Sequence, residues 1–322
     1  MSALGRKVTV DEADGAAIER RLHRVGRLVR LARALEAGGF YNGSKALRAG
    51  ADRELTIVAA PAAQLAHDEV AAEIDELAGD LAAAGYPSWF GRQLGVTAAA
   101  VRADESIPFQ SAPPAWSCRV CGELFLDIPP TTCPTCEAPA IGFRNHEAVW
   151  YLELSDRSST VDALAHGPSQ IGRVLQGRTD EQLDRRPRPA EWSARETLEH
   201  ITGAEELLSA RIRRMLDEED PELVAWQPGE APPPSDEATH HRPDAGAQEL
   251  FEHYRRLRLA NVAVLRGLDA ASWQRTGRHP EWGPVTVLSQ ASYFARHQAA
   301  HQAQLAAAVE GRVPGEPRPV GA

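Results

Sequence analysis

The sequence has no long hydrophobic run. Its longest apolar stretch, around Ile57 to Ala66, is short and is interrupted by Pro61 and Gln64, whereas a membrane-spanning helix needs about 20 consecutive apolar residues. The chain begins with a charged segment instead of the apolar core of a secretory signal. We therefore expect a cytoplasmic protein that does not insert into a membrane.

The sequence also has no excess of basic residues. It carries 35 Lys and Arg against 45 Asp and Glu, which gives a formal net charge of −10. Nonspecific binding to nucleic acid or to a membrane surface requires a basic face. We expect neither partner, and we interpret the charge runs as solvated helix faces.

Cysteine is scarce, and its four residues are grouped in two C-x-x-C pairs. The first motif contains Cys118 and Cys121, and the second contains Cys133 and Cys136. In an intracellular chain this spacing predicts a tetrahedral metal site rather than a disulfide framework. Each pair is expected to curl its backbone so that amide N–H groups point at thiolate sulfur. A closed four-sulfur shell has no open position for a substrate.

The segment around these cysteines resembles the rubredoxin-like module of rubrerythrins. The shared features are C-x-x-C-G, two prolines before C-P-x-C, Ala-Pro after it, and the trailing Phe143. The resemblance implies an iron site that passes single electrons, with Trp116, Phe125 and Phe143 as a small core. A zinc ribbon uses the same ligands without redox function, so the sequence leaves iron and zinc open.

The chain lacks the ligand pattern of the rubrerythrin di-iron bundle. That site needs paired E-x-x-H motifs, and the only Glu with a His three residues later is Glu237, with His240. Residues 1–110 are therefore expected to be at most a shortened relative without di-iron ligands. The four-cysteine module follows at residues 111–146.

Apolar positions at helical spacing predict three helices in this N-terminal region, over about 10–36, 44–60 and 62–84. A further segment, 94–101, is too short to assign. We expect a helical hairpin or a three-helix unit.

Two histidines, His297 and His301, lie four residues apart in a segment without Gly or Pro. On a helix such positions share a face, with Cβ atoms about 5–6 Å apart, so their ring nitrogens can meet one metal ion at about 2.0–2.1 Å each. Histidines inside an apolar stripe either bind a metal or form hydrogen bonds in an ordinary core. The stripe comprises Leu288, Ala291, Phe294, Ala295, Leu305 and Ala308.

A third histidine, His200, follows a helix start. Ser193 is a good N-cap and Glu196 completes a capping box. The pattern W-S-x-x-E-x-x-x-H here, and H-x-x-x-H-x-x-Q ending at Gln304, resemble the DinB-like family of metal-binding four-helix bundles. The resemblance covers about residues 158–311.

In that family three histidines on two helices hold one divalent metal, zinc, nickel or another, and they match His200, His297 and His301. Three imidazoles leave the ion open positions, which is a catalytic arrangement. The resemblance implies a small-molecule substrate and a thiol-dependent S-transferase, isomerase or hydrolase, with a low-molecular-weight thiol as one candidate partner. Glu196 is a candidate catalytic base, although capping explains it equally well.

The alternative is a non-enzymatic redox or metal-sensing protein that acts through the rubredoxin-like module. Bundles of the DinB-like family often form dimers, so a homodimer is one candidate assembly, and the sequence leaves the oligomeric state open.

The expected fold is mainly α, with an N-terminal helical region, a small β module and a C-terminal four-helix bundle. Bundle helices are predicted over about 159–177, 193–219, 247–268 and 285–311. The span 220–246, with six prolines, predicts a flexible loop in which His240 and His241 are exposed. Residues 312–322 are expected to form a flexible tail.

Overall fold

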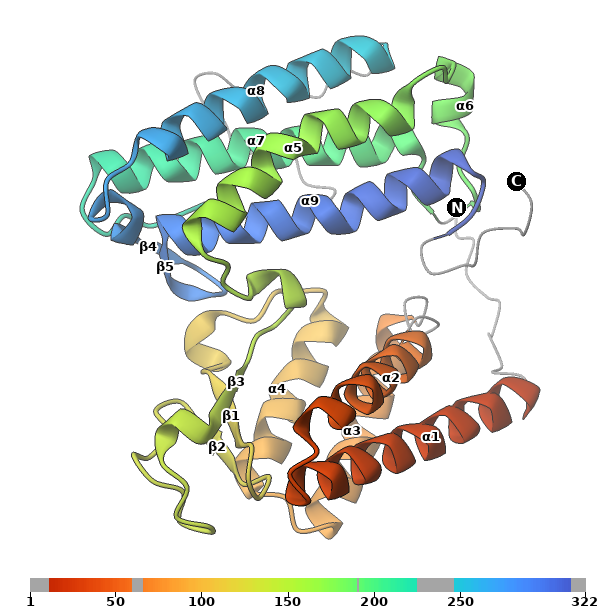
Figure 1. The fold of residues 1–322 in the computed structure, drawn as a ribbon, viewed down its shortest axis with the longest axis vertical. Helices are drawn as coiled ribbons and strands as arrows, with labels where there is room; N and C mark the ends of the chain where they lie inside the picture. The colour runs from red at the N-terminus through yellow and green to blue at the C-terminus, as the bar shows by residue number, and fades with distance from the viewer. Residues whose placement is uncertain (1–11, 60–65, 190, 225–245, 314–322) are drawn as a thin grey trace.

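The computed structural model describes residues 12–59, 66–189, 191–224 and 246–313. Figure 1 shows a layer of long helices at the C-terminal end of the chain, and below it the N-terminal helices with a small sheet. The predicted fold class, mainly α with a small β module and a C-terminal four-helix bundle, is confirmed. The predicted loop histidines, His240 and His241, lie outside the described residues.

The N-terminal region contains two helical hairpins. Helix α1 (Glu12–Ala37) packs on α2 (Tyr41–Ala59), and α3 (His67–Ala83) packs on α4 (Ser88–Ala103). This differs from the expected single hairpin or three-helix unit, because α4 extends six residues before the unassigned segment 94–101. It starts directly after Pro87, which takes the N-cap position.

The four-cysteine module is a three-stranded antiparallel sheet. Strand β1 (Ala115–Cys118) lies between β2 (Leu124–Leu126) and β3 (Phe143–His146). The predicted small core is present, since Phe125 and Phe143 are buried with two of the cysteines and Trp116 packs against them.

A short linker joins this module to the bundle. Residues Trp150–Leu152 form a 3-10 turn, η4, which packs on α9 (Val287–Val309). Nearby, Arg296 donates to the Leu154 carbonyl at 3.3 Å and the Ser155 amide donates to Ser292 Oγ at 3.3 Å. The linker therefore lies against the helix that carries two of the predicted metal ligands.

The bundle consists of α5 (Arg157–Leu175), α7 (Ala194–Asp217), α8 (Ala247–Gly267) and α9. Helix α5 begins at the N-cap Asp156, whose carboxylate accepts from the Ser159 amide at 2.9 Å, and the helix continues through Pro168. A short helix that was not predicted, α6 (Asp180–Asp184), lies between α5 and α7.

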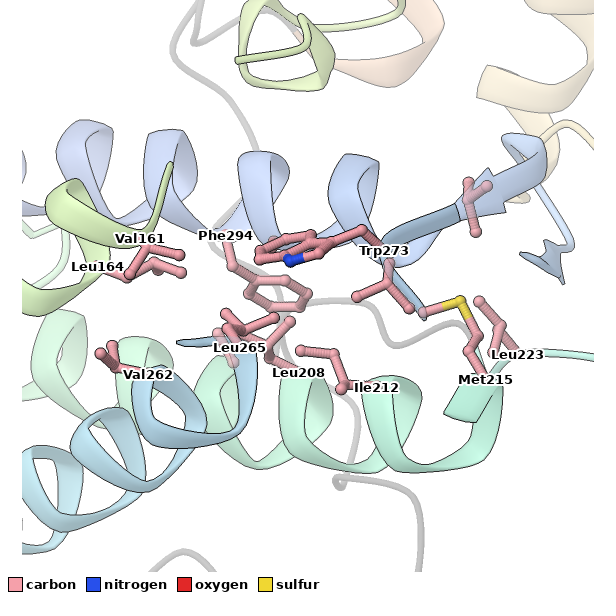
Figure 2. Packing of buried hydrophobic residues seen from close by; sticks show 14 residues of the cluster. Val161, Leu164, Leu208, Ile212, Met215, Leu223, Val262, Leu265, Trp273 and Phe294 are labelled. Atoms are coloured by element: carbon pink, nitrogen blue, oxygen red, sulfur yellow. The ribbon is translucent and has the colours of Figure 1, made fainter. Parts of the chain in front are cut away.

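Apolar side chains from all four bundle helices form the core. In Figure 2, Phe294 of α9 and Trp273 lie against residues of α7, α8 and α5. Full burial of one such Leu or Phe side chain contributes about 1.5–3 kcal/mol. The labelled members are Val161, Leu164, Leu208, Ile212, Met215, Leu223, Val262, Leu265, Trp273 and Phe294.

A β-hairpin that was not predicted closes one end of the bundle. Strand β4 (Thr276–His279) pairs with β5 (Gly283–Thr286), which leads directly into α9. The start of the predicted flexible span packs beside it: Leu223 is buried, and its amide donates to the Arg278 carbonyl at 2.8 Å. The first residues of that span are thus ordered by main-chain pairing.

Among the described helices, none is both long and apolar enough to cross a membrane.

Candidate functional site

Helix α7 starts with the predicted capping box. The Glu196 amide donates to Ser193 Oγ at 3.1 Å, and the Ser193 amide donates to the Glu196 carboxylate at 2.7 Å. This reciprocal pair satisfies two backbone donors at the helix start. The cap fixes where α7 begins, and His200 therefore lies on the face that meets α9.

The three predicted histidines come together. The Nε2 atoms of His200 and His301 each lie 3.1 Å from Nε2 of His297. All three ligand atoms are within 4.8 Å of one another. Tetrahedral ligands at about 2.0–2.1 Å from a zinc ion would be about 3.3 Å apart, so the observed spacing fits a single divalent ion.

Hydrogen bonding around His301 supports the same assignment. Its Nδ1 lies 2.8 Å from Gln304 Oε1. Because an amide oxygen can only accept, Nδ1 carries the proton and Nε2 presents a lone pair. That lone pair points at His297 Nε2, which faces His200 Nε2 as well. One hydrogen on His297 cannot serve both neighbours, whereas a cation among the three nitrogens satisfies them all.

Burial keeps these rings neutral. It lowers the pKa of His200 to about 4 and that of His297 to about 2, and the neighbouring imidazoles add to both effects. Burial also lowers the pKa of His301. Neutral imidazole is the form that binds a metal.

The histidines line a cavity of about 300 Å³. Aromatic rings make up much of its wall, and two of them stack on the histidines: Trp192 on His301 at 6.0 Å between ring centroids, and Tyr293 on His297 at 5.5 Å. The remaining lining residues are Tyr151, His200, Ala204, Leu207, Arg211, His279, Glu281, Trp282 and Phe294.

Glu196, the predicted catalytic base, is held in the cap. One carboxylate oxygen accepts from the Ser193 amide and the other from the Arg186 guanidinium. Among the described residues that line the cavity, Glu196 does not appear. Its capping role is therefore observed, and its catalytic role stays a prediction.

The four cysteines also converge. Cys118 Sγ lies 3.6 Å from Cys136 Sγ, and Cys121 Sγ lies 3.6 Å from Cys133 Sγ. Tetrahedral sulfur ligands at about 2.3 Å from a metal would be about 3.8 Å apart. These distances fit a tetrathiolate and exclude disulfide bonds.

The predicted amide hydrogen bonds to sulfur are present. Amide groups of Cys121 and Val120 lower the pKa of the Cys118 thiol to about 7, although burial opposes the shift. Gly122 occupies the positive-φ position of the first turn, at 88°, a conformation that suits glycine.

Histidines outside the triad have separate surroundings. His253 is partly buried, and its Nε2 lies 3.0 Å from Glu206 Oε1. His166 is exposed, and its Nδ1 lies 2.6 Å from the Asp162 carbonyl of its own helix. Neither ring joins the three-histidine group.

Sequence reasoning missed the second polar group of the cavity, Arg211, His279 and Glu281. His279 and Glu281 lie in the hairpin that was not predicted: His279 ends β4, and Glu281 is in the turn before β5. The sequence did contain a signal for Arg211, because it lies eleven residues after His200 on the same predicted helix. At 3.6 residues per turn, that separation is close to three full turns and places both side chains on one face.

Comparisons with known proteins agree with this bundle. Residues 163–305 match the family model of the DinB superfamily. The uncharacterized protein YuaE of Bacillus subtilis strain 168 is 24% identical over 139 residues, which cover 41% of this chain and 85% of that protein. The matched segment 163–305 contains all three histidines. The C-terminal half is thus a DinB-like four-helix bundle, as the motifs predicted.

One solved structure is also similar. It is YfiT from Bacillus subtilis, described as a probable metal-dependent hydrolase with an unusual four-helix bundle topology. The two chains are 18% identical, and the match covers 49% of this chain and 88% of that chain with a TM-score of 0.41.

Proposed function

We propose that the DinB-like bundle is a metal-dependent enzyme that acts on a small molecule, by hydrolysis, isomerisation or thiol-dependent transfer. The observation that carries the proposal is the arrangement of His200, His297 and His301, three neutral imidazoles with Nε2 atoms within 4.8 Å of one another on the wall of a cavity of about 300 Å³. A structural metal site normally has four protein ligands, whereas a catalytic site has three and an open position.

A divalent ion in such a site lowers the pKa of water or of a thiol and polarises a carbonyl. The protein's own residues would do the rest. Gln304 holds His301 in the tautomer that binds metal. Trp192 and Tyr293 pack on the ligand rings, limit the access of water and offer an apolar surface to the substrate.

The four-cysteine module is proposed as an accessory iron or zinc site of the rubredoxin-like kind. Its four thiolates close the coordination shell, so substrate chemistry is assigned to the bundle and not to the module. With iron the module would pass single electrons, and with zinc it would be structural.

The second candidate function is a redox or metal-sensing protein that acts through this module. The convergence of Cys118, Cys121, Cys133 and Cys136 favours it. Iron with a reversible colour change on reduction, together with no turnover of esters, amides or thiol-transfer substrates, would support this alternative. Zinc at both sites, with a thiol-dependent turnover that is lost in His301→Ala, would support the enzyme.

Metal analysis of variants tests the separation of the two sites. We expect His297→Ala to abolish binding of the bundle metal and to leave the four-cysteine metal in place, because His297 Nε2 contacts both other ligands. His166→Ala is the control, since it removes an exposed imidazole from the same bundle. Metal content that is unchanged in His297→Ala would contradict the proposed enzyme site.

A further inference from the structure

The cavity contains one buried guanidinium. Arg211 is 4% exposed, and its N–H groups are held by the protein. Its Nε and Nη2 atoms donate to the Val224 carbonyl at 3.1 and 2.6 Å, Nη1 donates to Gln290 Oε1 at 2.8 Å, and Nη2 lies 3.0 Å from His279 Nε2. Nη1 carries two N–H groups, and among the described residues its one acceptor is Gln290, so at least one Nη1–H is left over.

The polar atoms that Arg211 contacts in the described chain are all neutral. Val224 offers a carbonyl and Gln290 an amide. Burial, with the charge of Arg211 itself, lowers the pKa of His279 to about 3, so that ring is uncharged at neutral pH. Burial lowers the pKa of Arg211 to about 10, although Tyr293 and Glu281 act in the opposite direction through space. The guanidinium is still cationic at neutral pH.

Among the described residues, one other arginine is buried, and its charge is paired. Arg258 forms an ion pair with Glu205, and both side chains are almost completely buried. A buried charge is costly unless it is paired. For Arg258 the ion pair with Glu205 offsets that cost. Arg211 instead faces a cavity and the Trp282 ring, with its Cζ 5.6 Å from the ring centroid.

A purely structural role explains the contacts of Arg211 but not its charge. A neutral side chain such as glutamine could also donate to the Val224 carbonyl. The positive charge becomes useful when an anion enters the cavity. Among the described residues that line it, Arg211 is the only lysine or arginine.

We propose that Arg211 is the anion-binding residue of this cavity, and that the substrate is a small carboxylic acid with a flat apolar body. One remaining N–H and one charge suit a monoanion better than a phosphate. The aromatic wall suits a flat body, and a cavity of about 300 Å³ is at the small end of ligand pockets. The inference names the substrate class of the proposed enzyme, and in that respect it rests on the proposed function.

Binding of two matched probes tests the charge preference. Benzoate and benzamide have nearly the same shape, but only benzoate is charged. By calorimetry, we expect benzoate to bind about 10-fold to 100-fold more tightly, the range for a hydrogen bond to a charged group. The preference should appear in zinc-loaded protein and in protein stripped with a chelator. Equal binding of the two probes, or no binding of benzoate to stripped protein, would overturn the proposal.

Variants then assign the preference to one residue. Arg211→Gln should remove it, whereas Arg213→Gln, which removes an exposed charge from the same helix, should retain it. Circular dichroism melting shows whether each variant folds. If Arg211→Gln does not fold, benzoate and benzamide binding is compared in Arg211→Lys and in stripped wild-type protein. Because Lys keeps the charge, Arg211→Lys should keep part of the preference for benzoate.

Two further outcomes are informative. If folded Arg211→Gln still prefers benzoate, another cation holds the acid and the proposal is wrong. If phenyl phosphate binds stripped protein more tightly than benzoate, the carboxylate assignment is wrong. Failure of the metal site is a separate result, since metal analysis of His297→Ala detects it and the probe preference in stripped protein does not depend on it.

Discussion

A single glutamine amide fixes which nitrogen of His301 faces the other two histidines. Gln304 Oε1 accepts from His301 Nδ1–H at 2.8 Å, one turn further along α9. Such partners fix the tautomer and the ring orientation of a ligating histidine, and their loss typically weakens metal affinity about 10-fold to 100-fold.

We therefore expect Gln304→Leu to weaken metal binding to the bundle by about 10-fold to 100-fold while the helix stays folded. The measurement is a zinc dissociation constant by competition with a chromogenic chelator, carried out on protein whose four-cysteine site is already filled. Gln302→Leu, two residues away on the same helix, is the matched control. Equal affinity of the two variants would show that Gln304 does not orient the ligand.

The sequence predicted the three histidines that converge, but not the rest of the cavity. His297 and His301 were readable because i and i+4 share a helix face, and His200 because a capping box fixed the start of its helix. Arg211 is brought beside them by its own helix, and His279 by a distant hairpin. The position of His279 depends on contacts between segments far apart in the chain, and residue spacing does not reveal such contacts.

Helices α5 and α9 approach closely at Gly167. A Cβ at this position would lie 2.3 Å from the Gln298 side chain. That side chain is buried, and its Oε1 accepts from the Tyr254 hydroxyl at 3.0 Å. It therefore has little freedom to move away, and the approach of the two helices depends on the missing side chain.

Gly167→Ala should lower the free energy of unfolding of the bundle by about 1–3 kcal/mol, the usual cost of overpacking. Gly267→Ala is the control, because nothing lies within 4 Å of a Cβ at the end of α8. There the better helix propensity of alanine should leave stability unchanged or raise it by up to about 1 kcal/mol. Thermal melts of both variants provide the comparison, and the idea fails if Gly167→Ala melts at or above the wild-type temperature.

At the scale of elements, the helices with strong caps and clear apolar spacing were predicted to within a few residues of their observed ends. The hairpin β4–β5 was missed because its strands are four residues long and contain Gly277 and Pro284. Its stability comes from outside the hairpin, since Gly277 packs against Met215 and Leu223. Helix α4 was missed because Gly91 and Gly95 weaken its local signal.

At the scale of the whole molecule, the four-cysteine module and the bundle have separate cores. The apolar cluster around Cys118 and Cys133 shares no residue with the two clusters of the bundle. Besides η4 and the linker, a described segment just before the module contacts the bundle: the Phe109 amide donates to the Pro280 carbonyl at 3.0 Å, and the Phe109 ring lies close to Gly283. Because the two cores are separate, the stability of the module should depend little on that of the bundle.

Loss of the four-cysteine metal should therefore unfold the module and spare the bundle. We expect Cys133→Ser to reduce the metal content from two ions per chain to one, since Cys133 is buried in the module core and a tetrathiolate contributes directly to folding. In calorimetry the bundle transition should stay within a few degrees of the wild-type value, because its core and its histidines are untouched. His297→Ala is the mirror-image control, with the loss confined to the other site. A large downward shift of the bundle transition in Cys133→Ser, or loss of both metals, would show instead that the two parts fold as one unit.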